Sequence, residues 1–110
     1  MSTTPDKTLF AIRRNRAWKS AAEVEEIAER SKQVADAHFA DELRWIRSYV
    51  IAEDDGSFGS ICIYEATGAD AIERHAKAVG MPAHDVWPIG NTVVIRPDPV
   101  TEPVREPALA

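Results

Sequence analysis

The chain has 110 residues, of which 45% are hydrophobic and 28% are charged, and its formal net charge is −5. This length provides one domain with one core, and the acidic balance argues against general binding to nucleic acid. No apolar run approaches the roughly 20 residues that span a bilayer, the N-terminus lacks a secretory-signal pattern, and the single cysteine, Cys62, excludes an intramolecular disulfide framework. We therefore expect a cytoplasmic protein that binds neither nucleic acid nor membrane.

The first half of the chain predicts a strand followed by a long helix. Residues 8–15 (TLFAIRRN) alternate as a strand does, with Phe10 and Ile12 on one face. The basic cluster RRNR at 13–16 is expected to be the solvated end of that strand. A capping box of Ser20 and Glu23 then opens an amphipathic helix over residues 21–38.

The second half predicts a hairpin, a helix and a last strand. Residues 43–52 and 58–66 read as strands joined by the turn EDDGS. A capping box of Thr67 and Asp70 is expected to start the second helix, which should end at Gly80. The run TVVIRP at 92–97 is expected to be the fourth strand. The domain should span 8–97, between an N-terminal extension, 1–7, and a flexible Pro-rich tail, 98–110.

This order, β-α-β-β-α-β, is typical of the ferredoxin-like α+β sandwich, in which two helices cover one face of a four-stranded antiparallel sheet. In the hairpin, a small aliphatic set is expected to face the helices: Ile46, Ser48, Val50, Ile61 and Ile63. The alternate set is more aromatic and polar: Trp45, Arg47, Tyr49, Ile51, Phe58, Ser60, Cys62 and Tyr64.

The second set is too apolar to be left entirely in water. We expect two such faces to pair in a homodimer of the α/β-barrel kind, enclosing a cavity lined by Trp45, Tyr49, Cys62 and Tyr64. The alternative is a monomer whose tail or another partner covers this face.

Two residues are expected to converge between the third strand and the second helix. His75 shares the helix stripe that packs on the sheet, and Glu65 ends the strand that leads into this helix. A carboxylate beside an imidazole can fix its tautomer and prepare it to bind a metal, or the two can simply be a buried pair. His38 is a further candidate ligand, or a partner of the first helix's dipole. His84 is either a surface residue or a ligand at a dimer rim.

An enzyme is the alternative to a metal-binding protein. A pocket holding a small molecule could use His75 as general base, with Tyr64 or Arg47 orienting the ligand. Cys62 could be a nucleophile, although a cysteine in mid-strand is more often a core residue. The sequence contains no glycine-rich phosphate loop, no GxSxG and no HExxH, which disfavours the familiar large enzyme classes.

The stretch RWIRSYVIAEDDGSFGSICIYEATGADAIERHAKAVGMPAHDVWPI resembles a small bacterial domain-of-unknown-function family whose members are often labelled nickel-binding protein. The motifs that carry the resemblance are a Trp-x-x-Ser-Tyr strand, a Tyr-Glu-Ala strand end, an Ile-x-x-His-Ala helix and a Gly-x-Pro stop. They stand at 45–49, 64–66, 72–76 and 80–82, and the resemblance spans about residues 8–96. Thr67 replaces the proline that the family has after Ala66.

The resemblance implies a ferredoxin-like fold, a dimer, and binding of Ni²⁺ or another divalent metal. It points to Glu65 and His75 as polar site residues, surrounded by Trp45, Ser48, Tyr49 and Tyr64. The sequence therefore favours a homodimer that binds a divalent metal through histidine and glutamate. A cofactor-independent dimeric α/β-barrel enzyme (a monooxygenase, isomerase or cyclase) and a purely structural dimer remain the alternatives.

Overall fold

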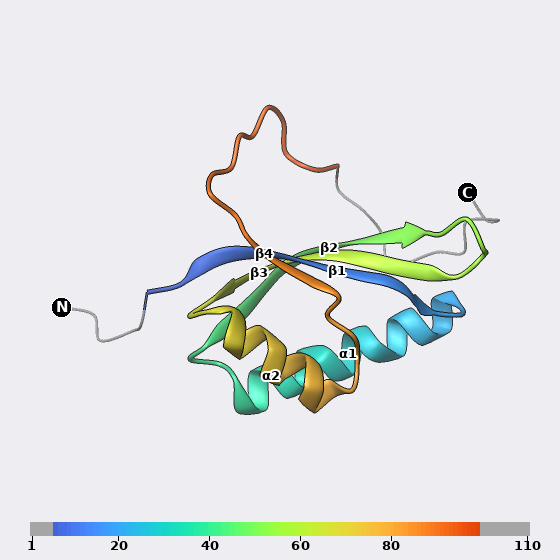
Figure 1. Ribbon diagram of the computed structural model, residues 1–110, viewed down its shortest axis with the longest axis horizontal. Helices are drawn as coiled ribbons and strands as arrows, with labels where there is room; N and C mark the ends of the chain where they lie inside the picture. Colours follow the sequence, from blue (N-terminus) through green and yellow to red (C-terminus); the bar gives the residue numbers. More distant parts are fainter. Residues whose placement is uncertain (1–5, 100–110) are drawn as a thin grey trace.

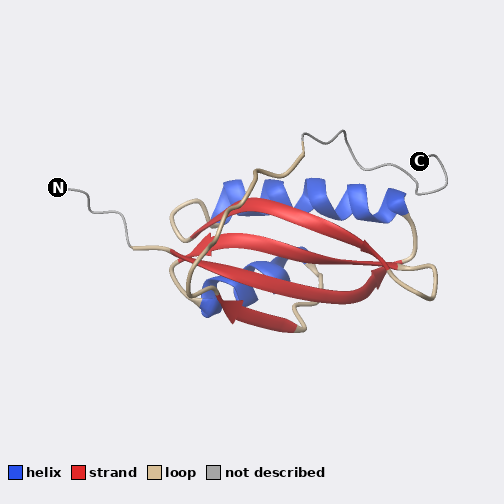
Figure 2. Ribbon diagram, turned by 90° about the horizontal axis from the view of Figure 1, so that it is seen from above, coloured by secondary structure: helices blue, strands red, loops and turns tan. Residues whose placement is uncertain are grey.

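The computed structural model describes residues 6–99, and it shows two helices covering one face of a four-stranded antiparallel sheet (Figure 1). The elements are β1 (Thr8–Trp18), α1 (Ala21–His38), β2 (Leu43–Ala52), β3 (Phe58–Ala66), α2 (Ala69–Val79) and β4 (Asp85–Pro88). The strand order across the sheet is β2-β3-β1-β4, and Figure 2 shows the four strands side by side. The ferredoxin-like α+β fold is thus confirmed. The predicted tail beyond residue 99 and the first five residues lie outside the described residues.

Of the two predicted capping boxes, one is confirmed. The Ser20 hydroxyl accepts a hydrogen bond from the Glu23 amide (3.2 Å), and the Glu23 carboxylate accepts one from the Lys19 amide (2.8 Å). The box at Thr67 and Asp70 is wrong, because α2 starts from Gly68 without any side-chain cap. Asp70 instead accepts a hydrogen bond from Arg74, one turn along the helix. The end of α2 at Gly80 is as predicted, with φ of 88°.

The fourth strand was placed wrongly by the sequence. Residues 85–88 form β4, because the stop at Gly80 and Pro82 brings the chain directly to the edge of β1. Two backbone hydrogen bonds flank the pairing of β4 with β1. The His84 amide donates to the Arg13 carbonyl (3.0 Å), and the Ile89 amide donates to the Leu9 carbonyl (2.9 Å). The predicted strand at 92–97 has β-branched residues but no strand partner in the described part of the chain.

The segment after β4 instead crosses the sheet on the side away from the helices (Figures 1 and 2). Asp98 near its end accepts hydrogen bonds from Arg47 (2.8 Å) and Tyr49 (2.7 Å) of β2. Three apolar residues in its middle, Val93, Val94 and Ile95, are 78%, 69% and 77% exposed.

The two sheet faces are also assigned differently from the prediction. Tyr64 and Cys62 pair with Phe10 and Ile12 of β1, and all four side chains are buried beneath the helices. Because side chains alternate along a strand, Ile61 and Ile63 lie on the other, open face. The predicted orientation of β3 is therefore reversed.

A bulge in β2 changes the prediction for the start of that strand, whereas Ser48 and Val50 pair with Cys62 and Ser60 and face the helices as predicted. Trp45 pairs with Tyr64 and Arg47 pairs with Ile63, so Ile46 is an extra residue between them. The bulge puts Trp45 on the helix-facing side, whereas Arg47 and Tyr49 lie on the open face. A strict alternation cannot reveal such an inserted residue.

The core lies between the sheet and the helices. It consists of aromatic and aliphatic side chains from β1, β2, β3, both helices and the α1–β2 connection, including Phe10, Ile12, Phe39, Leu43, Tyr64 and Ile72. Within residues 6–99, neither helix is long and apolar enough to cross a membrane.

Candidate functional site

A cavity of about 390 Å³ lies between α1 and the helix-facing side of the sheet. Short side chains face each other here, with Ala28 and Ser31 of α1 opposite Ser60 and Cys62 of β3, so the layer is incompletely filled. The volume falls in the usual range for small-molecule sites, about 300–1,000 Å³. We call this cavity the chamber. Its wall comprises Arg14, Trp18, Val24, Ile27, Ala28, Ser31, Trp45, Ile46, Arg47, Ser48, Val50, Ser60, Cys62, Tyr64 and Met81.

Arg14 is the most unusual residue of this wall. Its side chain is 0% exposed, and among residues 6–99 none of its three guanidinium nitrogens has a hydrogen-bond partner. An arginine stays charged throughout the physiological pH range. A buried charge left without a partner costs roughly 3–5 kcal/mol. Such a cost is expected where the charge has a role other than stabilising the fold.

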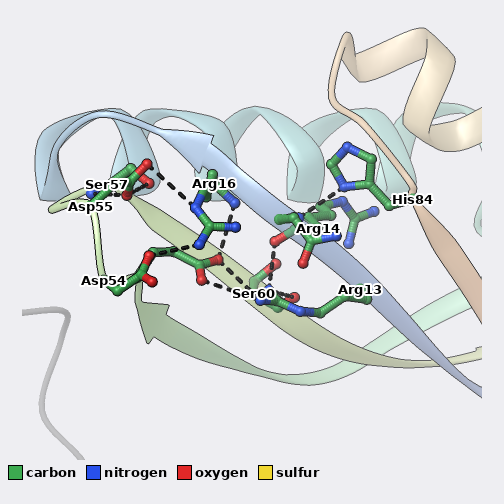
Figure 3. A network of polar contacts seen from close by, with 10 residues as sticks. Arg13, Arg14, Arg16, Asp54, Asp55, Ser57, Ser60 and His84 are labelled. Carbon is green, nitrogen blue, oxygen red and sulfur yellow. Dashed lines mark hydrogen bonds and ion pairs between the residues drawn. The ribbon is translucent and has the colours of Figure 1, made fainter.

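The neighbouring arginines show that carboxylates are available nearby. Arg13 leaves β1 on the opposite side from Arg14 and binds the Glu53 carboxylate (3.1 Å), while Arg16 binds Asp54 (2.6 Å) and Asp55 (3.4 Å) (Figure 3). These acids belong to the β2–β3 turn. Arg14 lies on the helix-facing side because it follows Phe10 and Ile12 at two-residue steps. Among the described residues that line the chamber, none is an aspartate or glutamate.

The end of β1 is held in place by this turn. Arg16 has φ of 45°, where the register of β1 against β3 shifts. The Glu53 carboxylate accepts a hydrogen bond from the Arg16 amide (3.0 Å), which stabilises the unusual backbone. The hydrogen bond from the Arg16 amide is the main reason why the pKa of Glu53 is lowered, and the hydrogen bond and charge of Arg13 lower it further.

Gly59 makes the arrangement possible. A Cβ added there would collide with the Glu53 carboxylate, with the Arg14 carbonyl and with the Arg13 guanidinium. Glycine therefore allows the turn acid to reach across β3 to β1.

The chamber wall has two further pairs of polar groups, one between two hydroxyls and one between a hydroxyl and a thiol. The Ser31 hydroxyl lies 3.4 Å from that of Tyr64, and the Ser60 hydroxyl lies 3.3 Å from the Cys62 sulfur. The Trp45 indole stacks on the Tyr64 ring, with centroids 6.1 Å apart and planes within 7°. Burial raises the pKa of Tyr64, so its phenol stays protonated and can donate a hydrogen bond.

His75 lies behind this wall rather than in it. Its imidazole is 1% exposed and Nε2 donates to the Ser31 carbonyl at 3.0 Å, which makes Nδ1 the acceptor nitrogen of a neutral ring. Nδ1 is buried and has no partner in the described part of the chain. Burial lowers the pKa of His75, and the charge of Arg14 lowers it further against the opposing hydrogen bond to Ser31.

The structure does not bring the predicted metal ligands together. Glu65 lies on the open face, where its carboxylate accepts a hydrogen bond from Arg44 (2.9 Å), so the sheet separates it from His75. His38 is exposed at the end of α1. His84 is exposed too, and its Nδ1 accepts a hydrogen bond from the Asn15 amide (2.8 Å). Residues 6–99 contain no group of three His, Cys, Asp or Glu side chains that could hold a metal ion, so this part of one chain does not by itself supply a ligand set for nickel.

The residues predicted for an enzyme are also dispersed. Tyr64 lines the chamber and His75 lies beyond it. Arg47 borders the chamber at the bulge, but its guanidinium binds Asp98 on the open face. Of the predicted cavity residues, Trp45, Cys62 and Tyr64 do line a cavity, but this cavity lies beneath α1, and Tyr49 points away from it.

The sequence pattern does not single out Arg14, because the RRNR cluster predicts a solvated strand end, whereas the structure buries this side chain. The signal was present in the strand parity, since Arg14 continues the series of Phe10 and Ile12. An arginine in phase with buried residues indicates either a long side chain that reaches the surface or a buried charge. Only the structure separates these two cases.

Comparisons with known proteins support the resemblance seen in the sequence. The model of a family described as "Nickel responsive protein SCO4226-like" matches residues 10–89. No curated protein matches the chain at a significant level. The crystal structure of SnoaB, a cofactor-independent oxygenase from Streptomyces nogalater, aligns with 82% of this chain and 97% of its own, at 20% identity and a TM-score of 0.46. Similarity at this level does not transfer an activity.

Proposed function

This chain belongs to the SCO4226-like family of nickel-responsive proteins, and we propose that it binds a small, largely apolar molecule in the chamber beneath α1. The observation that carries the proposal is an apolar cavity between α1 and the sheet, where a packed core would be expected. A few polar groups lie in its wall, and Arg14 is the most important of them. Ala28, Ser48 and Ser60 keep this space open because their side chains are short.

A chamber-filling substitution tests the proposal. Ala28→Leu adds three carbon atoms at the chamber wall, whereas Ala22→Leu adds the same atoms at an exposed position of the same helix. The uncharged probe 2-naphthamide should raise the melting temperature of the wild type and of Ala22→Leu, because a ligand that binds only the folded state stabilises it. It should not raise that of Ala28→Leu. A wild type whose melting temperature does not respond to this probe or to 2-naphthoate would rule the chamber out as a ligand site.

Nickel binding is a second candidate, which the family's description favours. Because His75 and Glu65 lie on opposite sides of the sheet, a shared ion would need ligands from another copy of the chain. Calorimetric titration with Ni²⁺, Zn²⁺ and Co²⁺ should compare the wild type with His75→Ala and His38→Ala. Unchanged nickel affinity in both variants would remove these histidines as ligands.

We also propose that a second copy covers the open face of the sheet. Ile61, Ile63 and Tyr49 lie on this face, and Trp87 of β4 is 49% exposed. The exposed residues Val93, Val94 and Ile95 add apolar surface on the same side (Figure 1). Light scattering at micromolar concentration should give twice the chain mass, and Ile61→Asp should reduce it to that of one chain. A wild type that scatters as a single chain would refute the dimer.

A further inference from the structure

We propose that the ligand of the chamber is an apolar organic carboxylate, whose carboxylate group pairs with the guanidinium of Arg14. This inference rests on the proposed function, since it specifies the chemical class of molecule that the same chamber takes.

Arg14 lacks an acidic partner among the described residues. Its guanidinium is fully buried with its five N–H donors unused among the described residues, although Arg13 and Arg16 on the same strand both have carboxylate partners. Of these three neighbouring arginines, Arg13 and Arg16 thus have acidic partners, whereas Arg14 has none among the described residues and forms part of a cavity wall. A bound anion would satisfy both the charge and the hydrogen-bonding capacity of Arg14.

The geometry of the group favours a carboxylate over other anions. A guanidinium presents two parallel N–H donors that match the two oxygens of a planar carboxylate. Arg14 is the one cationic group of the described wall whose guanidinium is not engaged elsewhere, because that of Arg47 binds Asp98. A single positive charge balances a monoanion but not a phosphate dianion.

The rest of the chamber wall suits a ligand whose remaining part, apart from the carboxylate group, is apolar. Trp18, Val24, Ile27 and Trp45 lie around the same cavity, and Trp45 presents an aromatic ring already stacked on Tyr64. Each carboxylate oxygen has a further lone pair beyond the one that accepts from Arg14, and the hydroxyl groups of Ser31 and Tyr64 are available as donors to it. The fixed positive charge also disfavours a divalent cation here, so the chamber and any nickel site are separate.

A matched pair of probes tests the carboxylate directly. The anion 2-naphthoate and the neutral 2-naphthamide have nearly the same shape, and calorimetry can measure both affinities for the wild-type protein. We expect 2-naphthoate to bind more than about tenfold tighter, since a charge-assisted bidentate hydrogen bond is stronger than a neutral one. Equal affinities would overturn the carboxylate inference and leave the chamber as a ligand site. If neither probe binds, the proposed function fails with it.

Arg14→Met then attributes the preference to one residue. Methionine retains much of the length without the charge, so the preference for 2-naphthoate should disappear while 2-naphthamide still binds. Arg44→Met removes an arginine from the open face and should keep the full preference. A preference that survives in Arg14→Met would refute the role of this residue. The comparison of the two probes in the wild type decides the ligand class even if Arg14→Met fails to fold.

Discussion

His75 joins the two helices, because its Nε2 donates a hydrogen bond to the Ser31 carbonyl in the middle of α1, 44 residues away in the sequence. The ring also makes an edge contact with Phe39, with centroids 5.5 Å apart. The neutral imidazole is thus part of the packing between α1 and α2, and its protonation should oppose folding.

The first prediction concerns pH. The pKa of His75 is lowered in the folded protein by burial, so below the unfolded value of about 6.5 the unfolded chain binds more protons at this position. The stabilising contribution is complete above that value and is lost as the pH falls toward the folded pKa. Urea unfolding of the wild type at about pH 7.5, 6.5 and 5.5 should show a falling free energy of unfolding. In His75→Gln the fall should be smaller, because this variant lacks the buried imidazole whose pKa is lowered. Parallel pH curves would contradict the prediction.

The second prediction concerns the charge of Arg14. Because its guanidinium is buried without a partner in the part of the chain that the structure describes, Arg14→Met should raise the free energy of unfolding of the ligand-free protein by about 1–4 kcal/mol. Arg44→Met at an exposed site should change it by less than about 0.5 kcal/mol. Chemical denaturation of the three proteins checks both values. A less stable Arg14→Met would show that the guanidinium has a stabilising interaction in the folded chain.

The third prediction concerns Gly59. Gly59→Ala should lower the free energy of unfolding by about 1–3 kcal/mol, since the added methyl group must displace the Glu53 carboxylate and the backbone of β1. Gly90→Ala serves as the control, because a Cβ there meets no atom. Thermal unfolding followed by circular dichroism measures the difference. Equal melting temperatures of the two variants would mean that the turn can shift without cost.

The fourth prediction separates backbone strain from steric collision. At Gly80, φ is 88° and a Cβ would have open space. Gly80→Ala should therefore destabilise the protein by about 1 kcal/mol through conformation alone. Denaturation against the wild type checks the value, and a neutral result would show that the end of α2 can adopt another backbone conformation.

Much of the architecture could be predicted from local patterns. The bounds of α1, β2 and β3 and the end of α2 agree with the prediction, because the capping box at Ser20, the turn at Gly56 and the stop at Gly80 act over a few residues. The fourth strand could not be predicted in this way. Residues 92–95 have the higher strand propensity, but 85–88 lie where the chain from α2 meets the free edge of β1.

The candidate site depended still more on tertiary structure. The extra residue Ile46 in β2 and the pairing of β3 with β1 decide which side chains face the helices, and both rest on contacts between strands distant in the sequence. For the same reason, Glu65 and His75 fall on opposite sides of the sheet.

The sequence by itself determined the element order, the ferredoxin-like fold and the family, since these depend on periodicity and on short motifs. Only the tertiary structure decided that Arg14 is buried without an acidic partner among residues 6–99 and that short side chains leave a cavity beside it. Burial and charge pairing depend on which strands meet, and no local pattern specifies that.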